Sequence, residues 1–163
     1  MKRKIIWGLA AVLILIQFIR PAKNQSNSIS DKDISTVYPV SAEVSGILKK
    51  ACNDCHSNNT VYPWYSNIQP VAWWLQHHVD EGKGELDFSN FASYSPKKQH
   101  HKLEEVIEQV KDGEMPLNSY TWIHKDAVLT DAEKRTLSDW AATLRNEIAA
   151  KNNLPAEPEK EKK

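Results

Sequence analysis

The sequence contains few of the residues that usually carry catalytic or phosphate-binding chemistry. Only two of its 163 residues are cysteine, two are methionine and five are glycine. The glycines form no loop of the kind that cradles phosphate, and no Ser-His-Asp arrangement or pair of catalytic carboxylates has a persuasive context. The formal net charge at pH 7 is zero, so the sequence gives no reason to expect nucleic acid as a partner.

Both cysteines belong to one short motif. In the stretch KKACNDCHSNN, Cys52 and Cys55 enclose two residues, and His56 follows the second cysteine directly. Three kinds of site use such a pair: a thioredoxin-like redox centre, a structural zinc site and the covalent attachment site of haem c. The context of the motif discriminates between them.

Haem attachment is the interpretation that this context favours. A redox pair normally follows a strand in a βαβ unit, whereas this motif ends an amphipathic helical pattern. A closed zinc site needs four ligands, and the sequence has neither a second cysteine pair nor two histidines at ligand spacing. In haem c each thiol adds across one vinyl group, and the next histidine reaches the iron. The motif therefore predicts one covalent haem c on Cys52 and Cys55, with His56 as an axial ligand.

Met115 is the best candidate for the second axial ligand of a six-coordinate iron. It is the only methionine besides the initiator, and it lies in KDGEMPLNSY between Gly113 and Pro116. A thioether opposite a histidine raises the reduction potential of the iron. Histidines are the rival ligands, and His78 is the best of them because it lies on the apolar stripe of its helix. The other rivals are His77, His100, His101 and His124.

Apolar periodicity predicts four helices and no convincing strand, so the expected fold class is all-α. Ser41 suits the N-cap of the first helix, and Thr130 with Glu133 forms a capping box at the start of the last. Gly82 and Gly113 mark the expected ends of the second and third helices. The expected helices are residues 43–56, 69–82, 95–113 and 129–150, and two aromatic-rich pieces, residues 62–68 and 118–124, are expected to be loops.

Aromatic side chains are the expected walls of a haem pocket. The chain has six tryptophans, which is many for its length, and haem is large, flat and apolar. Trp64, Trp74 and Trp122 are the candidates for the walls. The indole N–H of Trp122 or the hydroxyl of Tyr120 could bond a haem propionate. Trp140 fits the core-facing stripe of the last helix instead.

The two ends of the chain differ from the middle. A positively charged start, MKRK, precedes an apolar run over residues 5–19 that only Gln17 interrupts. This pattern is typical of an uncleaved signal anchor, which places a single-pass helix in the inner membrane and the haem domain in the periplasm. The expected parts are an anchor at residues 1–22, a linker at 23–42, a haem-binding domain at 43–152 and a disordered tail at 153–163.

The order of these features resembles a known family. A helix leads into Cys-x-x-Cys-His, a Gly-x-Met-Pro segment follows, and Leu-Thr-x-x-Glu opens the last helix. This order resembles small monohaem cytochromes c. More narrowly, CNDCHSNNTVYPWYSNIQPVAWWLQHHVDEGKGELDFSNF with GEMPLNSYTWIHKDAVLT is similar to the bacterial haem-binding-domain proteins, which are membrane-anchored relatives of cytochrome c. The resemblance covers residues 44–144. It implies a cytochrome c-like helical domain around one haem carried by Cys52 and Cys55, with His56 proximal and Met115 distal.

The leading functional hypothesis is a membrane-tethered one-electron carrier. Two axial ligands from the protein leave no easy place for a substrate on the iron, so electron transfer at the haem edge remains. The expected partners are the lipid bilayer and membrane-associated or periplasmic redox proteins. The alternative is a haem-based gas or redox sensor or a weak peroxidase, with Met115 displaced and His78 or His124 as the distal acid–base residue. A structural or haem-relay module of a larger complex ranks third.

Overall fold

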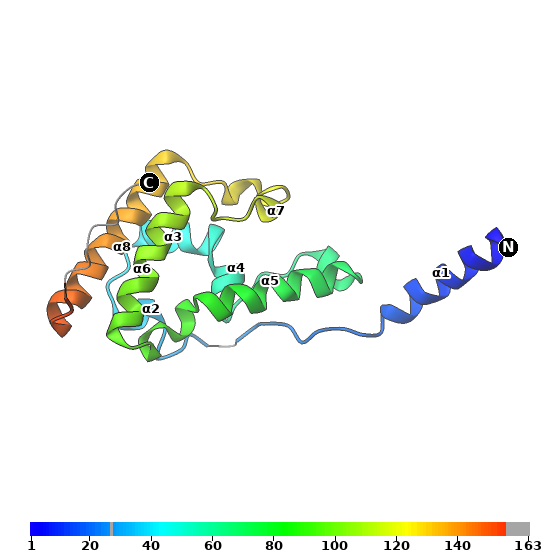
Figure 1. The fold of residues 1–163 in the computed structure, drawn as a ribbon, viewed down its shortest axis with the longest axis horizontal. Coiled ribbons are helices and arrows are strands. Elements are labelled where there is room, and N and C mark those ends of the chain that lie inside the picture. Colours follow the sequence, from blue (N-terminus) through cyan, green and yellow to red (C-terminus); the bar gives the residue numbers. More distant parts are fainter. Residues whose placement is uncertain (27, 156–163) are drawn as a thin grey trace.

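The computed structural model of the chain consists of helices and turns joined by extended segments (Figure 1). It describes residues 1–26 and 28–155. Within these residues no strand occurs, and extended backbone pairs only in an isolated antiparallel bridge between Gln25 and Asn59. The expected all-α class is therefore confirmed. Of the expected disordered tail, residues 156–163 lie outside the described residues.

Two long helices form the main packing unit of the domain. Helix α6 spans Pro96–Asp112, helix α8 spans Asp131–Asn152, and the two lie side by side (Figure 1). Leu103 of α6 and Leu137 of α8 are fully buried between them and their neighbours. The apolar core continues into the segments around this pair. Its other buried members are Ile34, Val44, Ile47, Leu48, Leu86, Phe88, Phe91, Val110, Leu129, Ala141, Leu144 and Ile148.

The helix caps predicted from the sequence are confirmed. The Ser41 side chain accepts a backbone N–H in the first turn of α3, which spans Ala42–Ala51. Thr130 and Glu133 form the reciprocal capping box at the start of α8. Gly113 ends α6 with φ 77°, in the left-handed region that glycine adopts without a steric penalty.

The helix expected over residues 43–56 breaks at Cys52. This residue has φ −126° and ψ −44°, so α3 ends before it. A separate single turn, α4 (Asn53–His56), then carries the second half of the motif. The two cysteines therefore lie on either side of the start of this turn, and His56 lies at its end.

Helix α5 (Val71–Glu85) packs closely on α4 through a glycine. The prediction that Gly82 ends this helix is wrong, because the helix continues to Glu85. A Cβ on Gly82 would lie 2.9 Å from the carbonyl oxygen of Cys55 and 3.0 Å from its Cβ. The absence of a side chain at Gly82 therefore allows α5 to approach the haem motif, and this packing explains the glycine.

Short turns complete the fold. The expected loops at residues 62–68 and 118–124 each contain a single turn, η1 (Trp64–Asn67) and α7 (Asn118–Thr121). These turns keep the aromatic side chains near the surface, since none of the residues in η1 and α7 other than Ser66 is buried. The remaining turns are α2 (Ile34–Val37), η2 (Phe88–Ser93) and η3 (Lys125–Ala127).

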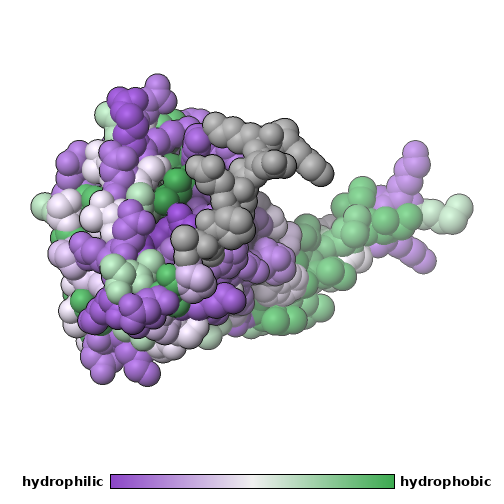
Figure 2. Space-filling model, turned by 60° about the vertical axis from the view of Figure 1, so that its left-hand side comes forward, coloured by the Kyte–Doolittle hydropathy of each residue, from purple (hydrophilic) through white to green (hydrophobic). Residues whose placement is uncertain are grey.

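Helix α1 (Lys2–Ile16) has no buried residue and projects away from the domain (Figure 1). Figure 2 shows apolar residues gathered on this projecting helix, beside a largely hydrophilic domain face. Its 15 residues extend about 22 Å, whereas the hydrocarbon core of a bilayer is about 30 Å thick. Over residues 1–26 and 28–155, none of the helices has the length and apolarity that a membrane span requires. The prediction of a single-pass helix in the inner membrane is therefore wrong.

Residues 17–26, here called the N-terminal strap, are tied to the domain by side chains. The Gln17 side chain donates to the Gln69 carbonyl at 3.2 Å and accepts the Gln69 amide at 2.9 Å. Asn24 Oδ1 accepts a hydrogen bond from Lys83 Nζ at 2.8 Å. The strap therefore contacts the start and the end of α5, and the Gln17 contact coincides with the point at which α1 ends.

Glu133 joins α8 to α3 in addition to capping α8. One carboxylate oxygen lies 2.6 Å from Lys50 Nζ, and the other accepts the Thr130 amide at 2.9 Å. The Lys50 contact and then the Thr130 bond lower the pKa of Glu133 from 4.5 to about 2. A carboxyl with a lower pKa in the folded chain adds stability above its ordinary pKa, and this stability is lost as the pH falls through the folded value.

We expect Glu133→Gln to lower the free energy of unfolding at neutral pH by up to about 1 kcal/mol, the usual range for a surface ion pair. The difference from wild type should shrink as the pH falls from 4.5 to about 2. Denaturant unfolding followed by circular dichroism over this range measures the effect. Glu147→Gln, at an exposed position of the same helix, is the control. If the free energy of unfolding of Glu133→Gln were lower than that of wild type by the same amount at every pH, the role of the Glu133 charge would be contradicted.

Gly82→Ala tests the close packing of α5 on α4. The added methyl group would clash with backbone atoms of Cys55, so α5 must shift, and we expect the free energy of unfolding to fall by about 1–3 kcal/mol. Gly46→Ala is the matched control, because nothing lies within 4 Å of a Cβ at this exposed position of α3. Alanine at position 46 should add about 0.5–1 kcal/mol of stability. Urea unfolding of both variants measures the two changes in the free energy of unfolding. An increase in both variants would exclude the steric role of Gly82.

Candidate haem site

A cavity of about 820 Å³ lies between α4, the C-terminal half of α5, α6 and the segment before α7. Its volume falls within the range that cofactor sites usually occupy. The structure brings Cys52, Cys55, His56, Met115 and Tyr120 from the set of predicted site residues to its lining. Apolar side chains make up much of the rest of the wall, namely Ala51, Leu86, Phe88, Val106, Val110 and Leu117.

Both cysteines are free, partly buried thiols that face this cavity. Burial, and then the neighbouring Cys55, raises the pKa of Cys52 to about 12. Burial, and then the charge of Asp54, raises the pKa of Cys55 to about 11. Both groups are therefore neutral at ordinary pH. A thioredoxin-like redox pair depends on a lowered cysteine pKa, so this environment disfavours the redox interpretation.

His56 is oriented by a hydrogen bond to the segment after α5. Its Nδ1 lies 2.9 Å from the carbonyl oxygen of Leu86, and a carbonyl can only accept, so Nδ1 carries the proton. Burial lowers the pKa of His56 although the Leu86 bond acts in the opposite direction. The neutral ring, placed edge-on to Phe88 with centroids 6.2 Å apart, keeps a lone pair on Nε2. Histidines that bind metals usually make such a bond through the other ring nitrogen.

Met115 reaches the cavity from the segment between α6 and α7. Its amide donates to the Gln109 carbonyl at 3.1 Å, so the start of the segment is fixed to the last turns of α6. Its side chain is half-buried. His78 of α5 also lines the cavity, with Nδ1 2.8 Å from the carbonyl oxygen of Trp74. Met115 and His78 are therefore the two predicted distal ligands that the structure brings to the site.

The other candidate histidines do not line this cavity within the described part of the chain. His77 and His101 are exposed and pair with glutamates on their own helices. His100 is buried in α6. His124 stacks on Tyr120 with centroids 4.2 Å apart.

The tryptophans predicted as pocket walls lie elsewhere. Trp64, Trp74 and Trp122 are 76%, 46% and 73% exposed, and none of them lines the cavity. Tyr120 does line it, but its hydroxyl donates to Asp54 at 2.7 Å. Burial, and then this bond, raises the pKa of Tyr120, so the phenol keeps its proton.

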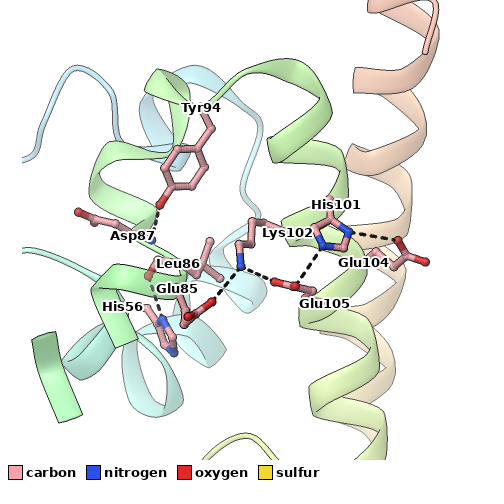
Figure 3. A network of polar contacts seen from close by, with 9 residues as sticks. All are labelled: His56, Glu85, Leu86, Asp87, Tyr94, His101, Lys102, Glu104 and Glu105. Atoms are coloured by element: carbon pink, nitrogen blue, oxygen red, sulfur yellow. Dashed lines mark hydrogen bonds and ion pairs between the residues drawn. The ribbon is translucent and has the colours of Figure 1, made fainter. Parts of the chain in front are cut away.

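Lys102 of α6 is a site residue that the sequence analysis missed. Figure 3 shows its ammonium group between Glu85 and Glu105, at 3.2 Å and 2.6 Å. Burial opposes its charge, but the bonds with Glu105 and Glu85 outweigh burial and raise the pKa of Lys102. Among the described residues that line the cavity it is the one lysine, and no arginine joins it. It therefore places a cation, paired with two glutamates, on the cavity wall.

These residues fit a haem better than a metal ion. In the part of the chain that the structure describes, no three side chains of His, Cys, Asp or Glu gather as ligands, so the zinc interpretation gains no support. The cavity instead combines two neutral thiols, an imidazole with a free nitrogen and a thioether. Apolar walls and one cation complete a set that matches a flat, apolar ring with two carboxylates.

Comparison with known proteins identifies the family. The family model of the haem-binding domain matches residues 11–143, well over half of the chain. The match includes the cysteine motif, α5, α6 and the Met115 segment. A search of the curated proteins and of the solved structures finds no match to this chain. By this match, and with a cavity whose lining suits the cofactor, the chain belongs to the haem-binding domain family.

Proposed function

We propose that Cys52 and Cys55 hold one haem through two thioether bonds. Each bond forms when a thiol adds across a vinyl group: the sulfur bonds one carbon, its hydrogen goes to the other, and no electrons are gained or lost. A protonated thiol carries both atoms that this addition needs, and burial keeps both cysteines protonated. The motif thereby resembles that of c-type cytochromes.

We propose His56 and Met115 as the axial ligands. The Leu86 carbonyl fixes the proton of His56 on Nδ1 and leaves Nε2 for the metal. Met115 approaches the same cavity from a different segment, which favours ligation from the other side of the ring. The observation that carries the proposal is this convergence: both thiols, the imidazole and the thioether line one cavity.

The function that this arrangement supports best is one-electron transfer to and from other redox proteins. A bound haem supplies an iron that changes its charge by one electron. The side chains of His56 and Met115 occupy the positions where a substrate would otherwise bind. The apolar wall excludes water from the ring, and Lys102 places a positive charge beside it. These residues tune the potential and provide no acid–base machinery for turnover.

The alternative, a sensor or weak peroxidase with a displaceable distal ligand, is favoured by one observation. His78 lines the same cavity as Met115. With Met115 away from the iron, the ring of His78 is a candidate acid–base group on the cavity wall. The two functions therefore differ in whether Met115 occupies the distal position.

Covalent attachment is tested by mass. Protein made in a host with a cytochrome c maturation system should weigh one haem more than its chain under denaturing conditions. Cys52→Ser and Cys55→Ser should each keep one thioether at most, and the double variant should lose the haem to acid–solvent extraction. Wild-type protein that loses its haem to the same extraction would refute the covalent bond.

Distal ligation is tested by a matched pair of variants. Met115→Ala should abolish the weak near-infrared band of methionine-ligated ferric haem. It should also lower the reduction potential by a sizeable part of the range of about 0.8 V that axial ligands span. His78→Ala should leave the band in place. Absence of the band from wild type, or rapid carbon monoxide binding by reduced wild type, would favour the sensor or peroxidase.

A further inference from the structure

Asp54 lies between the two cysteines of the haem motif, and both of its carboxylate oxygens are hydrogen-bonded. Oδ1 accepts the amide of Val61 at 2.9 Å, and Oδ2 accepts the hydroxyl of Tyr120 at 2.7 Å. Its backbone carbonyl accepts the hydroxyl of Thr60 at 2.6 Å. One residue of the motif therefore holds two other segments in place: the loop after α4 and helix α7.

Tyr120 is fixed at its ring as well as at its hydroxyl. The ring stacks on His124, with planes 12° apart. His124 Nε2 in turn lies 3.1 Å from the hydroxyl of Tyr65. A phenol that donates to a carboxylate at such a short distance makes one of the stronger kinds of hydrogen bond in proteins. Tyr120 therefore attaches α7 firmly to α4.

The segment that carries Met115 is short and attached at both ends. At its start, the amides of Glu114 and Met115 donate to the Gln109 carbonyl at 3.0 Å and 3.1 Å. At its end, the hydroxyl of Tyr120 bonds Asp54. Loss of the second attachment would leave the Met115 segment held at α6 and, beyond α7, by the contact of His124 with Tyr65.

We propose that Tyr120 is a positioning residue whose hydrogen bond to Asp54 keeps Met115 at the iron and so closes the distal position to other ligands. This inference rests on the proposed ligation by Met115. With the bond made, the iron is closed and suits electron transfer. With the bond broken, Met115 leaves more often and small ligands gain access. The two functions considered above therefore differ by the state of one hydrogen bond.

The test removes one hydroxyl at a time. Tyr120→Phe deletes the donor to Asp54 and keeps the ring that stacks on His124. Tyr65→Phe is the matched control, because it deletes a neighbouring hydroxyl that contacts His124 and leaves Asp54 bonded. The full-length haem proteins are reduced and mixed with carbon monoxide. We expect Tyr120→Phe to bind it on the order of tenfold faster than wild type, and Tyr65→Phe to resemble wild type.

A double-mutant cycle shows whether the bond itself is responsible. Asp54→Ala alone should also speed carbon monoxide binding, and adding Tyr120→Phe to it should have little further effect. Asp54→Asn leaves one accepting oxygen for two donors, the Val61 amide and the Tyr120 hydroxyl, so its rate should lie between those of wild type and Asp54→Ala. Effects of Asp54→Ala and Tyr120→Phe that simply multiply would overturn the proposal, as would equal rates in Tyr120→Phe and Tyr65→Phe.

A measurement on the haem-free full chain separates this inference from the proposed function. Amide hydrogen exchange in residues 114–121 should be faster in Tyr120→Phe than in Tyr65→Phe. Equal exchange in the two variants overturns the positioning role whatever the haem does. Absence of the methionine band from wild type, in contrast, refutes the ligation by Met115 and with it the proposed closure of the iron.

Discussion

The hydrogen bond from His56 Nδ1 to the Leu86 carbonyl is the contact on which the site depends. It fixes which nitrogen carries the proton, and therefore which nitrogen is free to bind a metal. It also joins α4 to the end of α5, so the direction of the ring follows from where α5 ends. Helix α5 can lie this close to α4 because Gly82 has no side chain and leaves room for Cys55. Backbone packing thus determines the chemistry of the imidazole.

One physical cause acts on both cysteines and the histidine of the motif. Burial penalises charge, and it raises the pKa of both thiols and lowers the pKa of His56. All three groups are therefore held in their uncharged forms. For the imidazole, this is the form that binds metal ions. Lys102 keeps its charge in the same surroundings because Glu85 and Glu105 compensate for the loss of water.

The local features of this chain could be predicted from its sequence, and the non-local ones could not. The capping box of α8 involves neighbours in the sequence, and the motif and Met115 are recognisable because their residue types are rare. In the sequence, Gly82 looks like a residue that stops a helix. The structure shows instead that a glycine is needed there because the backbone packs against Cys55, which is far away in the chain. The end of α1 also involves a distant contact, because Gln17 bonds Gln69. Lys102 could not be predicted as a site residue because its partner Glu85 lies at the end of another helix, α5. Aromatic side chains gave no reliable guide, because hydrophobic surface is also left exposed in folded proteins.

The N-terminal strap has a consequence for the order in which the chain matures. Asn24 precedes its partner Lys83 by 59 positions, so it is synthesised earlier. Lys83 also donates to Asn58, just beyond the cysteine motif, at 2.6 Å. During translation the motif therefore emerges before the lysine that ties the strap to the motif's flanking loop. A nascent chain that ends before Lys83 therefore contains both thiols but lacks the bonds from Lys83 to Asn24 and Asn58.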